Sequence, residues 1–435
     1  MRIAIEGARL IDPAAEMDRI AGLYLAEGRI AGVGAMPAGF VADRRIDGRG
    51  LVAAPGLIDL CARMREPGAD GALRIEMRAA LAGGVTGIVC PPDTDPPLDE
   101  PGLVRMLRQR SREAAGARLY PLGALTAGLK GKTLAQLCTL SEVGCVAFAQ
   151  TGALPDDRGA LLNALRYART FDLPVWLRPV DATLASEGVA GEGGVAGRLG
   201  LAAVPAVAET VALHTIFELQ RATGRQPVRI HLCRLSTAAG VELVRTARRQ
   251  GLPVTADVSI LHVHGVDTDI GQFDSNWRLD PPLRTQQDRA ALRAAVADGT
   301  IDAVCSDHAP AALEEKLLPF GEARAGASGL ETLLSLLLSW AQSDKVALLR
   351  ALDAVTRGPA RVLGEDTGTL LAGRKADVVL FDPIERWTVN GEALLSFGKN
   401  TPYLGRELAG RVRATIVGGE IRFEQAPGGA ASASS

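Results

Sequence analysis

The sequence predicts a mixed α/β protein: a (β/α)8 barrel of the TIM type, with a small β module built from both ends of the chain. Three observations lead to this fold class. Short apolar runs of strand character recur through the middle of the chain, and both ends alternate apolar with polar residues. The length of 435 residues fits one barrel of roughly 250 residues and a smaller companion module.

Eight apolar runs lie between residues 55 and 310, and enough residues separate successive runs for a crossover helix. Two of the connecting segments have helical patterns: residues 207–220 carry an apolar stripe, and residues 240–249 end in arginines, as a helix C-terminus favours. Strands that alternate with helices are typical of a parallel barrel. The runs are centred on 57–60, 85–90, 119–122, 145–148, 174–177, 228–233, 253–258 and 301–305.

The two ends of the chain have a different pattern. Residues 1–54 and 368–424 read as alternating strands, with turns at 12–13, 27–28 and 47–48 in the first piece. We expect the two pieces to form one composite β module that packs on a barrel domain of residues 55–367. Residues 425–435 are small and polar, which predicts a disordered tail.

Composition excludes several classes of protein. Apolar residues make up 47% and charged residues 23%, as in ordinary globular domains, and a net charge of -2 provides no basic field for nucleic acid. No apolar run is long enough to span a membrane, and the first residues read as a strand instead of a signal peptide. We expect a cytoplasmic protein with no membrane or nucleic-acid partner, whose six scattered cysteines are reduced.

Residues 59–68 read Asp-Leu-Cys-Ala-Arg-Met-Arg-Glu-Pro-Gly and follow an apolar run, so they lie where a buried strand ends. This segment resembles the metal-site signature of type I dihydroorotases, members of the cyclic amidohydrolase superfamily. In that family it reads Asp-Leu-His-x-His-Leu-Arg-Glu-Pro-Gly, and both histidines bind zinc. The resemblance extends in order over almost the whole chain, through residues 280–284, 299–303, 306–310, 314–316, 326–332, 373–377 and 400–402.

The resemblance places former zinc-ligand positions at the C-terminal ends of the barrel strands. Four histidines and a bridging carboxylate of the family have been replaced, and Gln150 or Thr151 stands where that carboxylate would be. Only Asp307, a ligand and general base in the family, is retained. No lysine lies beside Gln150 to supply a carboxylated side chain. The former ligand positions are Cys61, Arg63, Gln150, Arg178, Arg234 and Asp307.

Arginine cannot take the place of these ligands. A catalytic zinc ion needs about three protein ligands with free lone pairs, whereas a guanidinium offers only donors and repels a dication. We therefore predict that zinc and any other cofactor are absent. Asp307 is then a vestigial catalytic residue, with no activated water on which to act. By the same resemblance Arg65, Asp93, Asp280 and His308 are vestigial substrate-binding positions.

Unpaired buried charges are costly, so we expect the three arginines of the former site to pair with Asp307, Asp93 and Asp181. As an alternative, they and Arg65 hold a carboxylate or a phosphate. For Cys61 we favour a small thiol that fills a vacated histidine site over a reactive thiolate. A His-x-His pair at residues 262–264 is out of register with the ligands of the family, and we do not expect it to bind zinc.

The lost ligands and the resemblance together predict a catalytically inactive dihydroorotase homologue. In some bacteria a noncatalytic chain of this class assembles with aspartate carbamoyltransferase, which depends on it for a stable, active oligomer. The resemblance therefore implies a structural subunit in pyrimidine biosynthesis. Its expected partner is the catalytic chain of aspartate carbamoyltransferase, in homo- and hetero-oligomers.

Two other functions stay open on the sequence. An active amidohydrolase with an unorthodox site would use Cys61, Asp307 and either His231 or His308. A metal-free binder of pyrimidine-pathway anions would use the arginines. The dihydropyrimidinase-like cytoskeletal regulators also lack metal ligands, but the motifs at 65–68 and 280–284 favour the dihydroorotase branch.

Overall fold

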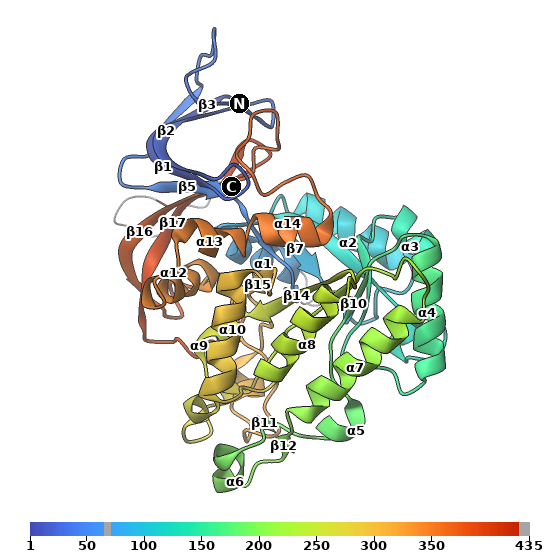
Figure 1. The fold of residues 1–435 in the computed structure, drawn as a ribbon. Helices are drawn as coiled ribbons and strands as arrows, with labels where there is room; N and C mark the ends of the chain where they lie inside the picture. The colour runs from blue at the N-terminus through green and yellow to red at the C-terminus, as the bar shows by residue number, and fades with distance from the viewer. Residues whose placement is uncertain (65–70, 426–435) are drawn as a thin grey trace.

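The computed structural model describes residues 1–64 and 71–425, and it contains all eight predicted barrel strands (Figure 1). The predicted tail at residues 426–435 and the motif at 65–68, including Arg65, lie outside the described residues. The predicted fold class is confirmed: a mixed α/β barrel, with a separate sheet formed by the chain ends.

The barrel strands run parallel, and each pairs with its neighbour in chain order. The first and last strands meet just beyond their ends, where the His308 backbone N–H donates to the Cys61 carbonyl (3.1 Å) and the Arg63 N–H donates to the His308 carbonyl (2.9 Å). These contacts nearly close the barrel. Its strands are β6 (Leu57–Asp59), β7 (Val85–Cys90), β8 (Arg118–Ala124), β9 (Ala147–Gln150), β10 (Val175–Leu177), β13 (Ile230–Leu232), β14 (Val254–Ser259) and β15 (Ala303–Cys305).

Helices surround the strands (Figure 1). The two helices predicted from the sequence are confirmed as α7 (Val207–Arg221) and α8 (Ala238–Arg249). The other long helices are α1 (Ala72–Ala82), α2 (Pro101–Glu113), α4 (Arg158–Thr170), α10 (Gln286–Asp298) and α12 (Leu333–Ser343). Shorter ones are α3 (Leu137–Glu142), α5 (Ala182–Ala185), α6 (Gly194–Leu199), α9 (Ile260–His264), α11 (Leu313–Lys316), α13 (Leu348–Asp353), α14 (Arg357–Leu363), η1 (Ala127–Leu129), η2 (Asp267–Ile270) and η3 (Ser275–Trp277).

Local sequence signals account for the start and end of α8. The Thr237 side chain accepts a hydrogen bond from the Gly240 N–H (2.9 Å), which satisfies a free donor in the first turn of the helix. Arg248 and Arg249 lie in the last turn, where positive charge is favourable. The loop that leads into this helix carries Arg234, so the capping fixes where a residue of the former metal site emerges.

The β module combines strands from both ends of the chain, as predicted. Its sheet order is β18-β17-β16-β5-β1-β2-β3, and β4 also pairs with β1. The N-terminal and C-terminal pieces join where β5 lies antiparallel to β16. The strands are β1 (Ile3–Asp12), β2 (Met17–Ala26), β3 (Arg29–Gly34), β4 (Arg44–Asp47), β5 (Val52–Pro55), β16 (Val378–Thr388), β17 (Glu407–Val417) and β18 (Glu420–Glu424), and a small separate pair is formed by β11 (Ala190–Gly191) and β12 (Ala203–Val204).

The module is packed directly on the barrel. Val379 and Val412 of the module belong to the same buried cluster as Met77 and Val85 of the barrel. Gly84 lies at this interface with φ +80°, and a Cβ atom there would be only 2.6 Å from a methyl group of Val379. Glycine is required because no other side chain fits both the backbone conformation and the space.

No helix in the described part of the chain is long and apolar enough to cross a membrane.

Candidate functional site

Bulky side chains fill the barrel interior below the former metal site. Trp176, which is 1% exposed, stacks against His231 with ring centroids 4.3 Å apart. His231 uses both ring nitrogens: Nδ1 contacts the Thr255 hydroxyl and Nε2 contacts the Asp257 carboxylate, each at 2.9 Å. These packed side chains therefore fill the barrel interior directly beneath the site.

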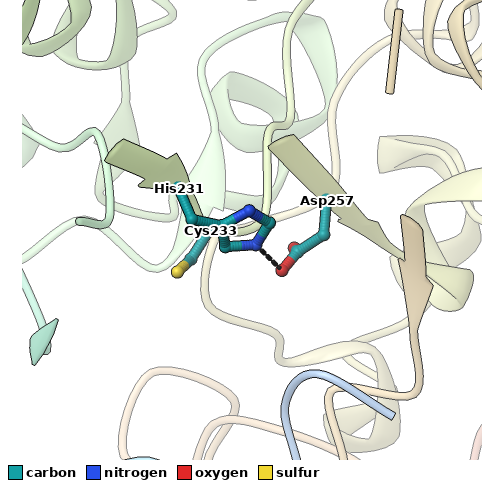
Figure 2. A group of neighbouring side chains, drawn as sticks. All are labelled: His231, Cys233 and Asp257. Atoms are coloured by element: carbon teal, nitrogen blue, oxygen red, sulfur yellow. Dashed lines mark hydrogen bonds and ion pairs between the residues drawn. The ribbon is translucent and has the colours of Figure 1, made fainter. Parts of the chain in front are cut away.

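His231, Cys233 and Asp257 place three possible metal-binding atoms within 4.8 Å of one another. Figure 2 shows the Asp257 carboxylate facing the imidazole, with the Cys233 sulfur projecting away from it. The Asp257 carboxylate also accepts a hydrogen bond from the Arg234 backbone N–H, at 2.7 Å. Of these three residues, the sequence had indicated only His231 as a candidate site residue. The spacing of residues 231 and 233 could also have indicated Cys233, because side chains two apart along a strand lie on the same face. Burial raises the pKa of the Cys233 thiol well above its usual value, which favours the neutral thiol.

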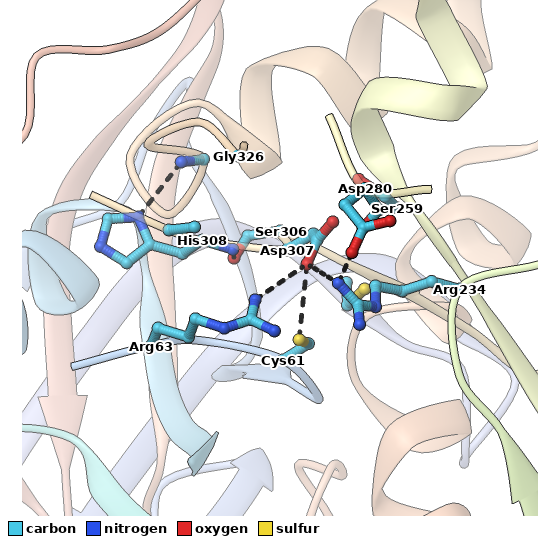
Figure 3. Close-up of polar contacts among 12 residues, drawn as sticks. Cys61, Arg63, Arg234, Ser259, Asp280, Ser306, Asp307, His308 and Gly326 are labelled. Atoms are coloured by element: carbon cyan, nitrogen blue, oxygen red, sulfur yellow. Dashed lines mark hydrogen bonds and ion pairs between the residues drawn. The ribbon is translucent and has the colours of Figure 1, made fainter. Parts of the chain in front are cut away.

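The former ligand positions lie at the mouth of the barrel, at or just beyond the C-terminal ends of β6, β9, β10, β13 and β15. Asp307 stands at the centre of this group and is 4% exposed. Figure 3 shows Arg63 and Arg234 approaching its carboxylate from opposite sides. The Asp307 carboxylate lies 3.0 Å from an Arg234 nitrogen, 3.6 Å from an Arg63 nitrogen and 3.5 Å from the Cys61 sulfur.

Arg63 bridges two carboxylates, because it also pairs with Asp93 at 2.9 Å. The predicted pairing of Arg63 and Arg234 with Asp93 and Asp307 is confirmed. Burial opposes the charge of Arg63, but the carboxylates of Asp93 and Asp307 outweigh it and hold the arginine pKa above its usual range. For Arg234 the same balance between burial and Asp307 raises the pKa well above the usual value. Both guanidiniums are therefore permanently charged.

The expected pairing was wrong for Arg178, which pairs with none of Asp307, Asp93 and Asp181. Arg178 forms a bidentate ion pair with Asp280, whereas Asp181 accepts a hydrogen bond from the Leu184 N–H at the start of α5 and pairs with Arg158 at 3.2 Å. The helix-capping contact and the ion pair with Arg158 hold the Asp181 carboxylate at the start of α5. Burial lowers the pKa of Arg178, and Asp280 offsets only part of this effect.

Gln150 turns away from Asp307. Its amide oxygen accepts from the Thr126 hydroxyl (2.8 Å) and its amide nitrogen donates to the Leu129 carbonyl (2.7 Å). Gln150 thus holds the loop after β8 in place.

The backbones of Arg234 and Asp307 both have positive φ angles, +59° and +50°. Such angles are unfavourable for residues other than glycine and persist where surrounding contacts hold the backbone in place.

His308 lies behind the cluster and is fully buried. Its Nε2 is 3.0 Å from the Glu76 carboxylate, and its Nδ1 accepts from the Gly329 N–H at 3.2 Å. Of the vestigial substrate-binding positions, the structure brings Asp93 and Asp280 to the arginines but buries His308 away from the mouth.

The comparisons with known proteins identify the family of this chain. Residues 48–239 match the family model described as Dihydro-orotase-like, and residues 189–422 match the Amidohydrolase family. A "Dihydroorotase-like protein" of Pseudomonas aeruginosa is 44% identical over 98% of this chain and all of that protein. The chain belongs to the dihydroorotase-like proteins of the amidohydrolase superfamily.

Two further proteins resemble this dihydroorotase-like chain, one in sequence and one in structure. A "Dihydroorotase" of Anaeromyxobacter dehalogenans is 39% identical over 97% of this chain and 98% of that protein. Among solved structures, the L-hydantoinase from Arthrobacter aurescens superposes with a TM-score of 0.85 and 21% identity, covering 97% of this chain and 96% of that one. The second likeness shows the shared fold.

The donor set of this dihydroorotase-like chain does not fit a catalytic dication. The groups that contact Asp307 include two guanidiniums and the Cys61 thiol. Burial, and to a smaller extent the negative charge of Asp307, raises the pKa of this thiol well above its usual value. A cavity next to Cys61 has a volume of only about 30 Å³ and is lined by residues that include Arg63, Arg178 and Arg234. That space holds about one water molecule. His262 and His264 lie on α9, and burial lowers the pKa of each to about 4.

Asp59, at the end of β6, is fully buried, and this burial shifts the pKa of its carboxyl group. Burial raises the pKa of Asp59 from 3.8 to about 6, against the hydrogen bonds from Ser306 and the Cys61 N–H. The folded protein therefore holds the Asp59 proton more tightly than the unfolded chain. This stabilisation is complete at low pH and is lost as the pH rises through about 6.

We expect the wild-type protein to lose about 3 kcal/mol of stability relative to Asp59→Asn between about pH 4 and about pH 7, because asparagine does not titrate. Urea unfolding of both proteins at both pH values measures the difference. The control is Asp156→Asn, which changes an exposed carboxylate. Parallel pH profiles for wild type and Asp59→Asn would show that Asp59 titrates normally.

Proposed function

We propose that this dihydroorotase-like chain is catalytically inactive and serves as a structural subunit of aspartate carbamoyltransferase in pyrimidine biosynthesis. The observation that carries the first half is the state of Asp307. Its carboxylate is buried and already engaged by Arg234, Arg63 and Cys61. All three contacts fall on one carboxylate oxygen, Oδ1, so this oxygen is already occupied by groups of the protein itself.

Hydrolysis or closure of a cyclic amide also requires something to polarise the carbonyl group and to activate water. The arginines offer hydrogen-bond donors, but each guanidinium is already in an ion pair with Asp93, Asp280 or Asp307, and none of them supplies an activated water. The cavity of about 30 Å³ that Cys61 and the three arginines line is too small for a pyrimidine ring. Both observations support loss of the reaction instead of an altered reaction through Cys61.

The second half of the proposal, the partner, rests on resemblance to the noncatalytic subunits of this class. A complete barrel and module that have lost their ligands are compatible with a scaffold role, because assembly uses outer surfaces and not the barrel mouth. The subunit role also accounts for a mouth closed by ion pairs: such a plug keeps the barrel packed without any ligand.

Co-expression with the cognate catalytic chain of aspartate carbamoyltransferase tests the proposal. We expect one size-exclusion peak that contains both chains, and a carbamoyltransferase that is less stable when expressed alone. Two separate peaks at micromolar concentration would refute the subunit role. Elemental analysis and a dihydroorotase assay on the purified chain test inactivity independently, and zinc together with turnover would refute it.

A further inference from the structure

We propose that a second cavity, beside the plugged site, binds a small oxyanion: a carboxylate or a phosphate. This cavity has a volume of about 480 Å³ and lies between the segment after β10, the start of α7 and residues 278–284. Its walls include three arginines, at positions 178, 278 and 284. The inference is independent of the proposed subunit role, because it rests on the charges of this cavity alone.

Two of the three arginines have no carboxylate partner. Within residues 1–64 and 71–425, neither Arg278 nor Arg284 forms an ion pair. Arg284 is only 7% exposed; it donates to the Val204 carbonyl and, weakly, to the Ser236 hydroxyl at 3.4 Å. Arg278 is half-buried and contacts only the Leu279 carbonyl, at 3.3 Å. Buried arginines normally have a charged partner, so a missing anion accounts for this arrangement.

The carboxylates near the cavity are committed elsewhere. Asp280 is held by Arg178 in a bidentate ion pair. Glu209 accepts four hydrogen bonds from the backbone and hydroxyl groups of Ser236 and Thr237, at 2.6–3.1 Å. The remaining acidic residue of the lining, Glu187, is exposed to solvent.

Two of the lining arginines also have a guanidinium nitrogen without a hydrogen-bond acceptor among the described residues. The Nε of Arg278 and that of Arg178 are buried, and no described residue accepts a hydrogen bond from either. Burial lowers the pKa of both Arg278 and Arg284, and the nearby carboxylates, Asp280 for Arg278 and Glu209 for Arg284, offset only part of this effect. A carboxylate or phosphate oxygen accepts from a guanidinium in a strong, charge-assisted contact.

The apolar part of the lining narrows the class of ligand. Val180, Val189, Val204 and Pro282 line the cavity together with the arginines. Its volume lies within the range of roughly 300–1,000 Å³ typical of small-molecule sites. A small organic acid or phosphate ester, with its carbon skeleton against the valines and its anionic end at Arg278, satisfies both parts.

Calorimetric titration with inorganic phosphate and with succinate, at matched ionic strength in sodium chloride, tests the proposal on the whole chain. Binding of phosphate alone identifies a phosphate site, binding of succinate alone identifies a carboxylate site, and binding of both supports a general oxyanion site. We expect Arg278→Gln to weaken binding by at least roughly tenfold, the loss expected for a charged hydrogen bond. The control Arg225→Gln removes an exposed positive charge away from the cavity and should bind as wild type does.

A second variant guards against a folding defect in Arg278→Gln. Ala185→Glu would place a carboxylate in the cavity wall, where it can pair with the arginines in place of the ligand. We expect Ala185→Glu to abolish binding. The proposal is overturned if wild type binds neither probe at millimolar concentrations, or if folded Arg278→Gln and Ala185→Glu bind as tightly as wild type.

Discussion

Replacing Asp307 with alanine is expected to destabilise the folded protein by about 3–5 kcal/mol, because removal of one member of a buried ion pair leaves charge without compensation. Asp307 is 4% exposed and Arg234 is 6% exposed, so water cannot take the place of the lost carboxylate. Arg63 loses one of its two carboxylate partners at the same time. Equilibrium unfolding in urea, compared with wild type, measures the effect.

The matched control is Asp93→Ala. Asp93 also pairs with Arg63, but the side chains of Asp93 and Arg63 are 27% and 26% exposed. Water can solvate the remaining guanidinium, so we expect a loss of about 0–1 kcal/mol. Equal losses for Asp307→Ala and Asp93→Ala would contradict the idea that Asp307 now plugs the mouth of the barrel.

Replacing Glu76 with alanine is expected to cost about 3–5 kcal/mol, again by breaking a buried charged network. Glu76 lies on α1 and is fully buried. Its carboxylate contacts His308 Nε2 at 3.0 Å and accepts from the Phe397 N–H at 3.2 Å. It therefore ties the loop between β16 and β17 to the barrel. Hydrogen exchange at residues 395–400 should become faster in Glu76→Ala, alongside the loss measured in urea.

The acid range separates charge from packing at Glu76. Burial opposes ionisation, but the His308 hydrogen bond outweighs it and lowers the pKa of Glu76. The stability due to the ionised carboxylate is therefore complete above the unfolded-state pKa of 4.5 and is lost as the pH falls through the lower folded-state pKa. Glu76→Gln should lack this acid dependence.

Arg78→Ala, on the exposed face of the same helix, serves as the control for both Glu76 variants. We expect it to change stability by no more than about 0.5 kcal/mol. If Glu76→Ala unfolds at the same urea concentration as Arg78→Ala, the network does not fasten the loop.

Much of the fold follows from local patterns. Each barrel strand is a run of apolar residues long enough to be recognised without knowledge of its neighbours, and the helices α7 and α8 carry their own stripe and cap. The composite module was predictable because both chain ends alternate in the same way. The replaced ligand positions were equally visible, since Cys61, Arg63, Arg178 and Arg234 stand inside recognisable motifs.

Contacts between distant segments were less predictable. Arg178 pairs with Asp280, 102 positions away, and not with the nearby Asp181, because the path of each loop decides which carboxylate arrives. The burial of His308 against Glu76 likewise depends on how α1 packs beside the end of β15.

By itself, the sequence determined the family, the barrel and module, and which side chains stand at the positions where the resemblance places metal ligands, because residue identity and periodicity are local properties of the chain. Only the tertiary structure decided which carboxylate neutralises which arginine and how small the cavity beside Cys61 is. It also decided that Arg278 and Arg284, beside a second cavity, find no ion-pair partner among residues 1–64 and 71–425. Those outcomes depend on distance and burial, which arise only when strand ends far apart in the chain are brought to one rim.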